Sequence, residues 1–266
     1  MIALRFRRIW GVLYRHLALY RQSKIQFAEL LYVPTMQMLV WGFTANYLTN
    51  RGNSSGAVAL GLVAGFLLWE VTLRAQLGMS NAFLEEVWSR NLVHLLVSPL
   101  RPAEFVTGLM GISVIRSALG IIPATLLAWV LYSYNVFAVG PVLLLLIVNL
   151  LMMGWWLGLA VIILVLRYGT GVQGFAWSIV MSLAPLAAIF YPVGILPHVL
   201  QEAAFVLPAS HAFEALRDLT QHRHVPWAQL GWAFLLNVGW IAALCGLLAR
   251  QFRSSRAAGT LISTGD

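Results

Sequence analysis

Three ionisable side chains fall inside long apolar stretches of the sequence or at their ends, where a charge is costly and therefore suggests a function. Glu70 and Arg74 are four residues apart, a spacing that permits an ion pair on one face of a helix. Arg116 lies about 11 residues into its own stretch, which is roughly 16 Å along a helix and near the middle of a bilayer. Glu70 is the acidic residue at comparable depth. We therefore expect a structural Glu70–Arg116 ion pair, with contact to a substrate as the alternative.

The sequence lacks the residue patterns of catalysis. It contains no G-x-x-x-x-G-K-[ST] loop, so we expect it not to hydrolyse ATP by itself. No cluster of histidine, cysteine or glutamate has the spacing of a metal site, and no constellation of an intramembrane enzyme is visible. His222 and His224 are two residues apart, and we interpret them as solvated side chains. These patterns predict a chain that is not an enzyme and holds no cofactor or metal of its own.

The composition is that of a membrane protein built from helices. Apolar residues make up 60% of the 266 residues and charged residues 10%, against roughly 45–50% and 25% in a typical soluble domain. These values exclude a water-soluble domain and a disordered chain. The single cysteine, Cys245, excludes a disulfide scaffold. The net charge of +8 is explained by basic residues beside apolar segments, so no nucleic-acid partner is expected.

Six apolar stretches are long enough for a helix to cross a bilayer, which takes about 20 residues. Thirteen basic residues lie on one side of these stretches and three on the other, which predicts that both termini are cytoplasmic. We therefore expect an all-α, six-span transmembrane domain over 27–266, preceded by an N-terminal segment over 1–26. The expected spans are 27–48, 57–73, 105–131, 136–166, 172–191 and 227–249.

The N-terminal segment has the pattern of an amphipathic helix that lies in the membrane interface. We expect its apolar face to lie in lipid and its arginines to lie near anionic headgroups, with His16 also at the interface. A solvated basic leader is the alternative, but it leaves the aromatic residues unexplained. The apolar face comprises Phe6, Ile9, Trp10, Leu13, Leu17 and Tyr20, and the other side carries Arg5, Arg8, Arg15 and Gln22.

The segment 76–104 is too interrupted to cross a bilayer and follows the second expected span on the cytoplasmic side. Ser80 or Asn81 can cap a helix that begins at Ala82, and Ser98-Pro99 should end it. Glu85 and Glu86 fall in the first turns of this helix, which favours acidic side chains. We expect a short amphipathic helix that aims its acids at the cytosol and docks a soluble partner. A solvated surface helix without a partner is the alternative.

The segment 192–226 is expected on the outer side. Prolines at 192, 197 and 208 forbid one continuous span, so Pro192, Pro197 and Pro208 divide it into two short helices. Glu214 and Arg217 are spaced i, i+3 on the second of them. The pieces are apolar enough to dip into the membrane, which predicts a re-entrant element that closes a pathway from outside, with Phe190 and Tyr191 at its constriction. An ordinary external helical loop is the alternative.

Two motifs in these segments resemble those of the membrane permeases of type-two ABC exporters. The first is FLEE-x-W-x-R-N-x-x-x-L-L-x-S-P-L-R-P-x-E, after the second span. The second is F-Y-P-V-x-x-L-P followed by L-P-x-x-H-x-x-E-x-L-R, between the last two spans. Together with the length and layout, the resemblance covers nearly the whole chain.

The resemblance implies a function, partners and a location. It implies a permease that pairs with a second copy and docks two soluble ATPase subunits, which bind ATP and Mg²⁺. It implies outward movement of a glycan, a lipid-linked compound or a drug-like amphiphile by alternating access, in a bacterial cytoplasmic membrane. The residues that it assigns to ATPase coupling are Glu85, Glu86, Trp88, Arg90 and Asn91. A channel or ion-coupled transporter that works without ATP is the alternative class.

Overall fold

The protein is a bundle of helices. The computed structural model describes residues 2–22, 24–50, 56–91, 100–132, 135, 139–222 and 225–258, and no strand occurs among them. The predicted all-α class is therefore confirmed. The α-helices are α1 (Ile2–Gln22), α2 (Lys24–Asn50), α3 (Gly56–Trp88), α5 (Pro102–Tyr132), α6 (Val142–Tyr168), α7 (Gln173–Leu186), α8 (His198–Phe205), α9 (Pro208–His222) and α10 (Trp227–Ala258), with 3-10 turns η2 (Thr170–Val172) and η3 (Val193–Ile195).

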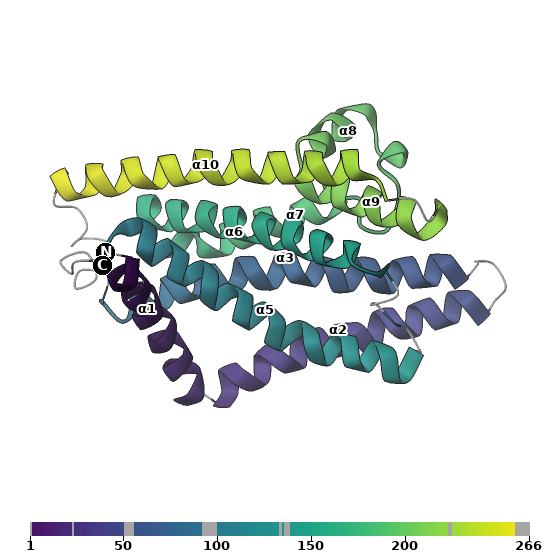
Figure 1. The fold of residues 1–266 in the computed structure, drawn as a ribbon, viewed down its shortest axis with the longest axis horizontal. Helices are drawn as coiled ribbons and strands as arrows, with labels where there is room; N and C mark the ends of the chain where they lie inside the picture. Colours follow the sequence, from purple (N-terminus) through teal and green to yellow (C-terminus); the bar gives the residue numbers. More distant parts are fainter. Residues whose placement is uncertain are drawn as a thin grey trace.

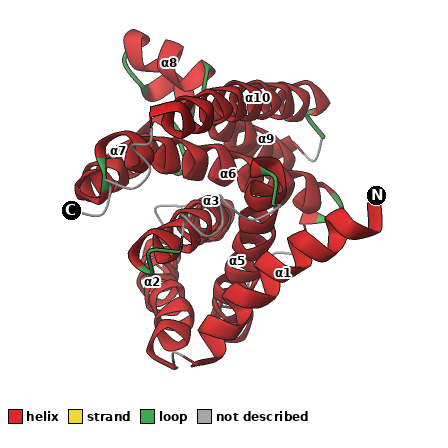
Figure 2. Cartoon of the chain, turned by 90° about the vertical axis from the view of Figure 1, so that its left-hand side faces the viewer, coloured by secondary structure: helices red, strands yellow, loops and turns green. Residues whose placement is uncertain are grey.

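The long helices run along one axis, and α3 lies at their centre (Figures 1 and 2). In the most apolar window of α3 83% of the residues are buried, against 17% in that of α10. The start of α1 and the end of α10 lie at one end of the bundle, near the end of α3 and the start of α5, whereas α9 lies toward the opposite end (Figure 1). We call these ends the terminal end and the α9 end. The α1 helix crosses the terminal end obliquely and meets α2 at a corner.

Four of the described helices are long and apolar enough to cross a membrane: Gly61–Trp88, Pro102–Tyr132, Val142–Tyr168 and Trp227–Gln251. The other two expected spans correspond to α2 and α7. The α2 helix has 27 residues, but Glu29, Thr35 and Gln37 interrupt its apolar sequence. The α7 helix has 14 residues, which is about 21 Å and short of a bilayer core of roughly 30 Å.

The predicted span 172–191 is longer than the helix that forms. Pro185 lies inside the last turn of α7 and has no N–H to continue the ladder of hydrogen bonds. The Ala188 N–H donates to the Pro185 carbonyl at 3.2 Å, and Ala188 takes the left-handed conformation, with φ 51°. The chain therefore turns away from the helix axis before Tyr191.

The contact between α3 and α6 depends on two glycines. Gly154 and Gly158 are spaced as G-x-x-x-G, a pattern that allows two helices to approach closely. A Cβ added to Gly154 would lie 2.5 Å from the Ala75 Cβ and 2.7 Å from the Thr72 carbonyl oxygen. The Thr72 hydroxyl donates to the Leu150 carbonyl at 3.2 Å across the same contact. The small residues therefore set the distance between the two helices.

A buried polar network joins α6 to α10. The Asn237 side-chain amide donates to the Asn149 carbonyl at 2.9 Å, and the Trp156 indole N–H donates to the Asn237 side-chain oxygen at 3.2 Å. The Trp156 ring stacks on Trp240, with ring centroids 5.1 Å apart. Because each buried polar atom in this set has a partner, the network fixes the position of α10 along α6.

We predict that Gly154→Ala destabilises the bundle. The added methyl group meets backbone and Cβ atoms that cannot move aside, so the loss should be about 1–3 kcal/mol. The matched control is Gly246→Ala in α10, where an added Cβ meets nothing within 4 Å. Thermal unfolding in detergent measures both variants, and equal melting temperatures would contradict the close α3–α6 contact.

Candidate functional site

The acidic pair of the coupling motif lies on the last turns of one uninterrupted helix. We expected a separate helix that begins at Ala82 with a cap at Ser80 or Asn81. Instead α3 continues through these residues to Trp88, and the Ser80 hydroxyl accepts a hydrogen bond from Gln76 at 3.0 Å. The prediction of a new helix start was wrong because nothing between Leu73 and Ala82 breaks the helical pattern. The residues 92–99, including the expected stop at Ser98-Pro99, lie outside the described part of the chain.

The side chains of Glu85 and Glu86 point into the protein rather than toward solvent. Glu86 is buried, and it contacts Arg15 at 3.0 Å and accepts a hydrogen bond from the Asn91 amide at 2.7 Å. Glu85 contacts Arg116 of α5 at 3.1 Å. The expectation that both acids face the cytosol is therefore corrected, since cations from two other helices surround them.

His16 of α1 completes this group and is fully buried. Its Nδ1 lies 3.2 Å from Glu85, and its Nε2 lies 3.4 Å from Glu86. Another ion pair joins α1 to the start of α5: the Arg8 guanidinium lies 3.5 Å from the Glu104 carboxylate. We call this group the junction; it consists of Arg8, Arg15, His16, Glu85, Glu86, Glu104 and Arg116.

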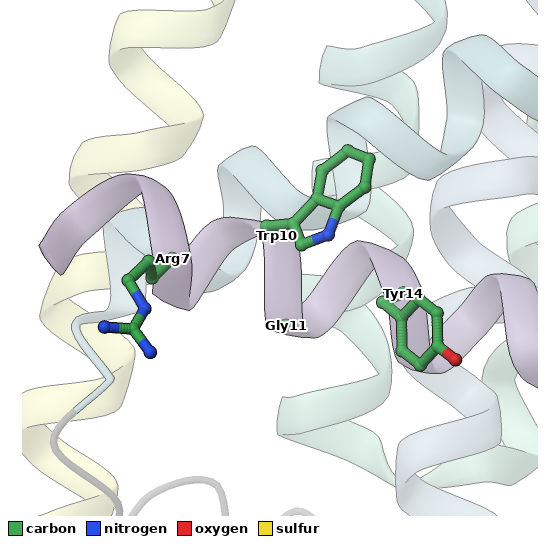
Figure 3. A pocket seen from close by; sticks show the side chains of 4 residues that line it. All are labelled: Arg7, Trp10, Gly11 and Tyr14. Atoms are coloured by element: carbon green, nitrogen blue, oxygen red, sulfur yellow. The ribbon is translucent and has the colours of Figure 1, made fainter. Parts of the chain in front are cut away.

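The orientation of α1 differs from the predicted one. The face that carries Arg8, Val12, Arg15 and His16 packs on the bundle, so the arginines pair with glutamates instead of extending toward headgroups. Trp10 and Tyr14 lie on the exposed face, where with Arg7 and Gly11 they line an open hollow of about 640 Å³ (Figure 3). The arginines were misplaced because their acidic partners lie about 70 residues or more away in sequence.

Arg116 does not pair with Glu70. Its guanidinium donates to the Gly78 carbonyl at 2.9 Å and to both Glu85 oxygens at 3.1 and 3.2 Å. Glu70 instead accepts from Arg74 at 2.9 Å, which is the i, i+4 pair that the spacing permits. The expected Glu70–Arg116 pair was wrong because Arg116 lies opposite Gly78, about two helical turns nearer the end of α3.

The end of α3 is shaped by a left-handed residue. Arg90 has φ 54°, its N–H donates to Val87, and the Asn91 N–H donates to Glu86. This is the Schellman arrangement, which satisfies the last carbonyls of a helix. The turn brings the Asn91 amide onto the Glu86 carboxylate and leaves Trp88 and Arg90 exposed. Of the residues assigned to coupling, these two therefore form the accessible surface.

The start of α5 is fixed to the junction by Glu104. Its Oε2 accepts a hydrogen bond from the Arg101 N–H at 3.0 Å, which is the reach-back half of a capping box. The same oxygen faces Arg8 at 3.5 Å. One carboxylate thus caps α5 and holds α1 against it.

The segment that we expected on the outer side forms two short helices, α8 and α9, in the places where the prolines predict them. Glu214 and Arg217 contact each other at 2.9 Å, and they also bind the chain that leaves α7. Glu214 accepts from the Val193 N–H at 2.8 Å, and Arg217 donates to the Ala188 carbonyl at 2.7 Å. The predicted pair therefore holds the turn after α7 against α9.

The aromatic residues expected at the constriction lie beside this turn. Phe190 stacks on Trp41 of α2, with centroids 4.4 Å apart, and the Tyr191 hydroxyl donates to Pro185 at 2.7 Å. Leu207 is buried in the core, whereas Phe205 on the preceding turn is exposed. Only part of the apolar run 203–207 is therefore covered by this chain.

Sequence reasoning missed His16 and the inward role of Arg8 and Arg15. One signal was present: Arg8, Val12, Arg15 and His16 recur at i, i+4, i+7 and i+8, which is itself a helical face. Cations on a buried helical face require acidic side chains opposite them. The first motif contains three such residues, Glu85, Glu86 and Glu104. Among the residues described, no group of three or more His, Cys, Asp or Glu could hold a metal ion.

The comparisons with known proteins agree with the motifs. A family model described as ABC-2 type transporter matches residues 7–220, from α1 through most of α9. No curated protein matches the chain.

We predict that the Glu85–Arg116 pair is energetically coupled. Glu85→Gln leaves a buried guanidinium without its carboxylate, which should cost about 3–5 kcal/mol. The double variant Glu85→Gln/Arg116→Met should cost less than the sum of the single variants, by about 0.5–3 kcal/mol. Unfolding in detergent measures the cycle.

The matched control is the same cycle with Glu70→Gln in place of Glu85→Gln. Its effects should add, because Glu70 pairs with Arg74 and not with Arg116. Additive effects in the Glu85 cycle, or coupling in the Glu70 cycle, would contradict the observed pairing.

Proposed function

We propose that this chain, which belongs to the ABC-2 type transporter family, is the transmembrane subunit of an ATP-driven exporter. Members of the family are the membrane subunits of transporters and associate with an ABC ATPase; they are not themselves the catalytic enzyme. The observation that carries the proposal is the family match over residues 7–220. It favours this function over a channel or ion-coupled transporter that works without ATP. We propose that ATP and Mg²⁺ are bound by two ATPase subunits and that the permease pairs with a second copy.

The proposed docking surface is the exposed end of α3, with Trp88 and Arg90. Large aromatic and arginine side chains carry much of the binding energy in protein interfaces. Glu85, Glu86 and Asn91 would act behind this surface, because they hold the end of α3 in place. A movement imposed on Trp88 would therefore be transmitted to α1 and α5 through the junction.

The α3 helix is suited to carry that movement to the α9 end. It has 33 residues, and no proline interrupts it. In its first half Trp69 contacts Phe213 of α9, with ring centroids 6.4 Å apart, and Phe66 contacts Trp41, at 6.1 Å. Trp41 in turn stacks on Phe190. One rigid helix therefore joins the proposed ATPase surface to the proposed constriction.

We propose that α8 and α9 form a re-entrant element that closes the pathway on the outside. The supports are the exposed Phe205, Val206 and Val199, which are apolar side chains that a membrane or a second copy would cover. Phe190 and Tyr191 would meet their copies at the constriction, and Pro192, Pro197 and Pro208 give the segment its bends. The proposed cargo is a glycan, a lipid-linked compound or a drug-like amphiphile.

We also propose six spans in a bacterial cytoplasmic membrane, with both termini in the cytoplasm. The direction of α2, α3, α5, α6, α7 and α10 alternates between the two ends of the bundle (Figure 1). Arg90, Arg101, Arg167 and Arg250 lie at or near the ends of α3, α5, α6 and α10 that meet at the terminal end, which supports a cytoplasmic location for that end (Figure 1). In this arrangement α7 is too short to cross the bilayer alone, and the chain that follows it completes the crossing.

We predict that Trp88→Ala weakens binding of the ATPase subunit by about 30-fold, which is the loss typical of an interface hot spot. The measurement is co-purification with an ABC ATPase and the ATPase rate of the reconstituted complex. Trp227→Ala is the control, because Trp227 is about as exposed (65% against 59%) but lies at the start of α10, away from the terminal end. Equal loss in both variants, or none in either, would contradict the proposed surface.

We predict opposite labelling of the two ends by a membrane-impermeant thiol reagent on intact cells. In a Cys245→Ser background, Glu202→Cys in α8 should react on intact cells. Ser89→Cys at the end of α3 should react only after the cells are permeabilised. Both residues are exposed in the folded chain, so the barrier tested is the membrane. Labelling of Ser89→Cys on intact cells would reverse the proposed orientation.

A further inference from the structure

A cavity of about 410 Å³ lies where α1, α2 and α5 come together. Its size falls within the roughly 300–1,000 Å³ that is usual for small-molecule sites. Its lining residues belong to the later part of α1, the start of α2 and the middle of α5. The cavity is separate from the hollow on the outer face of α1, which has other lining residues.

The walls of the cavity are apolar, and its charges are all of one sign. Leu17, Phe27, Ile115 and Leu119 supply apolar surface from three helices. The charged residues among those that line it are Lys24 and Arg116, and no acidic residue is among the described lining residues. An apolar wall beside cations matches a molecule that has a hydrocarbon part and an anionic group.

The two cations have different roles in the cavity. Arg116 is buried and is held by Glu85 and the Gly78 carbonyl, so its charge is largely compensated. Lys24 is exposed at the first residue of α2, and none of the ion pairs among the described residues involves its ammonium. Lys24 is therefore the cation that can contact an incoming anion.

We propose that this cavity binds an anionic phospholipid of the surrounding membrane. One acyl chain lies against Phe27, Ile115 and Leu119, and the phosphate lies at the Lys24 ammonium. Basic pockets between transmembrane helices are suited to acidic headgroups, because a lysine beside an apolar wall attracts the charge while the wall holds the chain. The cavity is partly open and is lined in part by α5, one of the helices able to cross a membrane, so we expect lipid to reach it.

The bound lipid would support the α1–α2 corner. Leu17 belongs to α1 and directly follows His16 of the junction, while Arg116 belongs both to the junction and to the cavity. A lipid in the cavity therefore contacts α1, α2 and α5 together and restrains the helix that carries Arg15 and His16. We infer that the protein is stabilised by acidic lipid beyond the effect of bulk bilayer.

The test uses the full-length permease in detergent micelles, without an ATPase, and adds phosphatidylglycerol or phosphatidylcholine with the same acyl chains. Retained lipid is counted by native mass spectrometry, and the melting temperature is measured in parallel. Phosphatidylglycerol should bind more tightly and raise the melting temperature more. Inorganic phosphate at the same concentration should do neither, because it lacks the acyl chain.

Lys24→Gln should lower the affinity for phosphatidylglycerol about fivefold and leave phosphatidylcholine unchanged. Arg250→Gln is the control, because it removes one exposed charge from α10. Ile115→Trp fills the apolar part of the cavity and should weaken binding of both lipids. Three results would each overturn the proposal. The affinity could be equal for both lipids, the affinity for phosphatidylglycerol could be unchanged in Lys24→Gln, or it could fall equally in Arg250→Gln. Because no ATPase is present, such a failure would leave the proposed exporter function standing.

Discussion

The architecture depends on the neutralisation of three glutamates at one end of the bundle. A carboxylate removed from water costs several kcal/mol unless cations and hydrogen bonds compensate it. Glu85, Glu86 and Glu104 meet that requirement only because α1 and α5 bring arginines and His16 to them. The position of α1 is therefore set by charge as well as by the apolar contacts of Val12, Leu13 and Leu17. A helix that could have lain free on the membrane surface is fixed to the transmembrane bundle.

The two ends of α3 are held by different kinds of contact, and this difference matters for movement. At the terminal end the contacts are ion pairs with short distances and defined partners, which transmit displacement and resist sliding. At the α9 end they are aromatic and small-residue contacts, such as Trp69 with Phe213 and Gly65 near Ile189. Apolar surfaces can shift past each other without leaving a charge unpaired. A rigid helix held by ion pairs at one end and by apolar contacts toward the other suits a lever.

The sequence predicts the helical membrane class, the amphipathic first helix, the two short helices after Pro192 and the Glu214–Arg217 spacing, because each depends on local patterns. It does not predict that Arg116 meets Glu85, since that depends on how far α3 and α5 slide along each other. A stagger of two turns changes the partner without altering either helix. The predicted helix start at Ala82 failed for a related reason: Ser80 is a good cap only where the preceding residues leave the helix.

The inward position of Arg8 and Arg15 on α1 follows from the same limit. An amphipathic pattern identifies two faces, but it does not say which face meets lipid when the polar face finds partners of opposite charge. Val12 lies between Arg8 and Arg15 and packs where an added Cβ on Gly108 would lie 2.7 Å from its side chain. That close approach is possible only because α5 has a glycine there. Three glycine positions of the bundle, 108, 111 and 154, thus bring helices near enough for polar groups to pair, and the ionic junction forms where Gly108 and Gly111 admit α1.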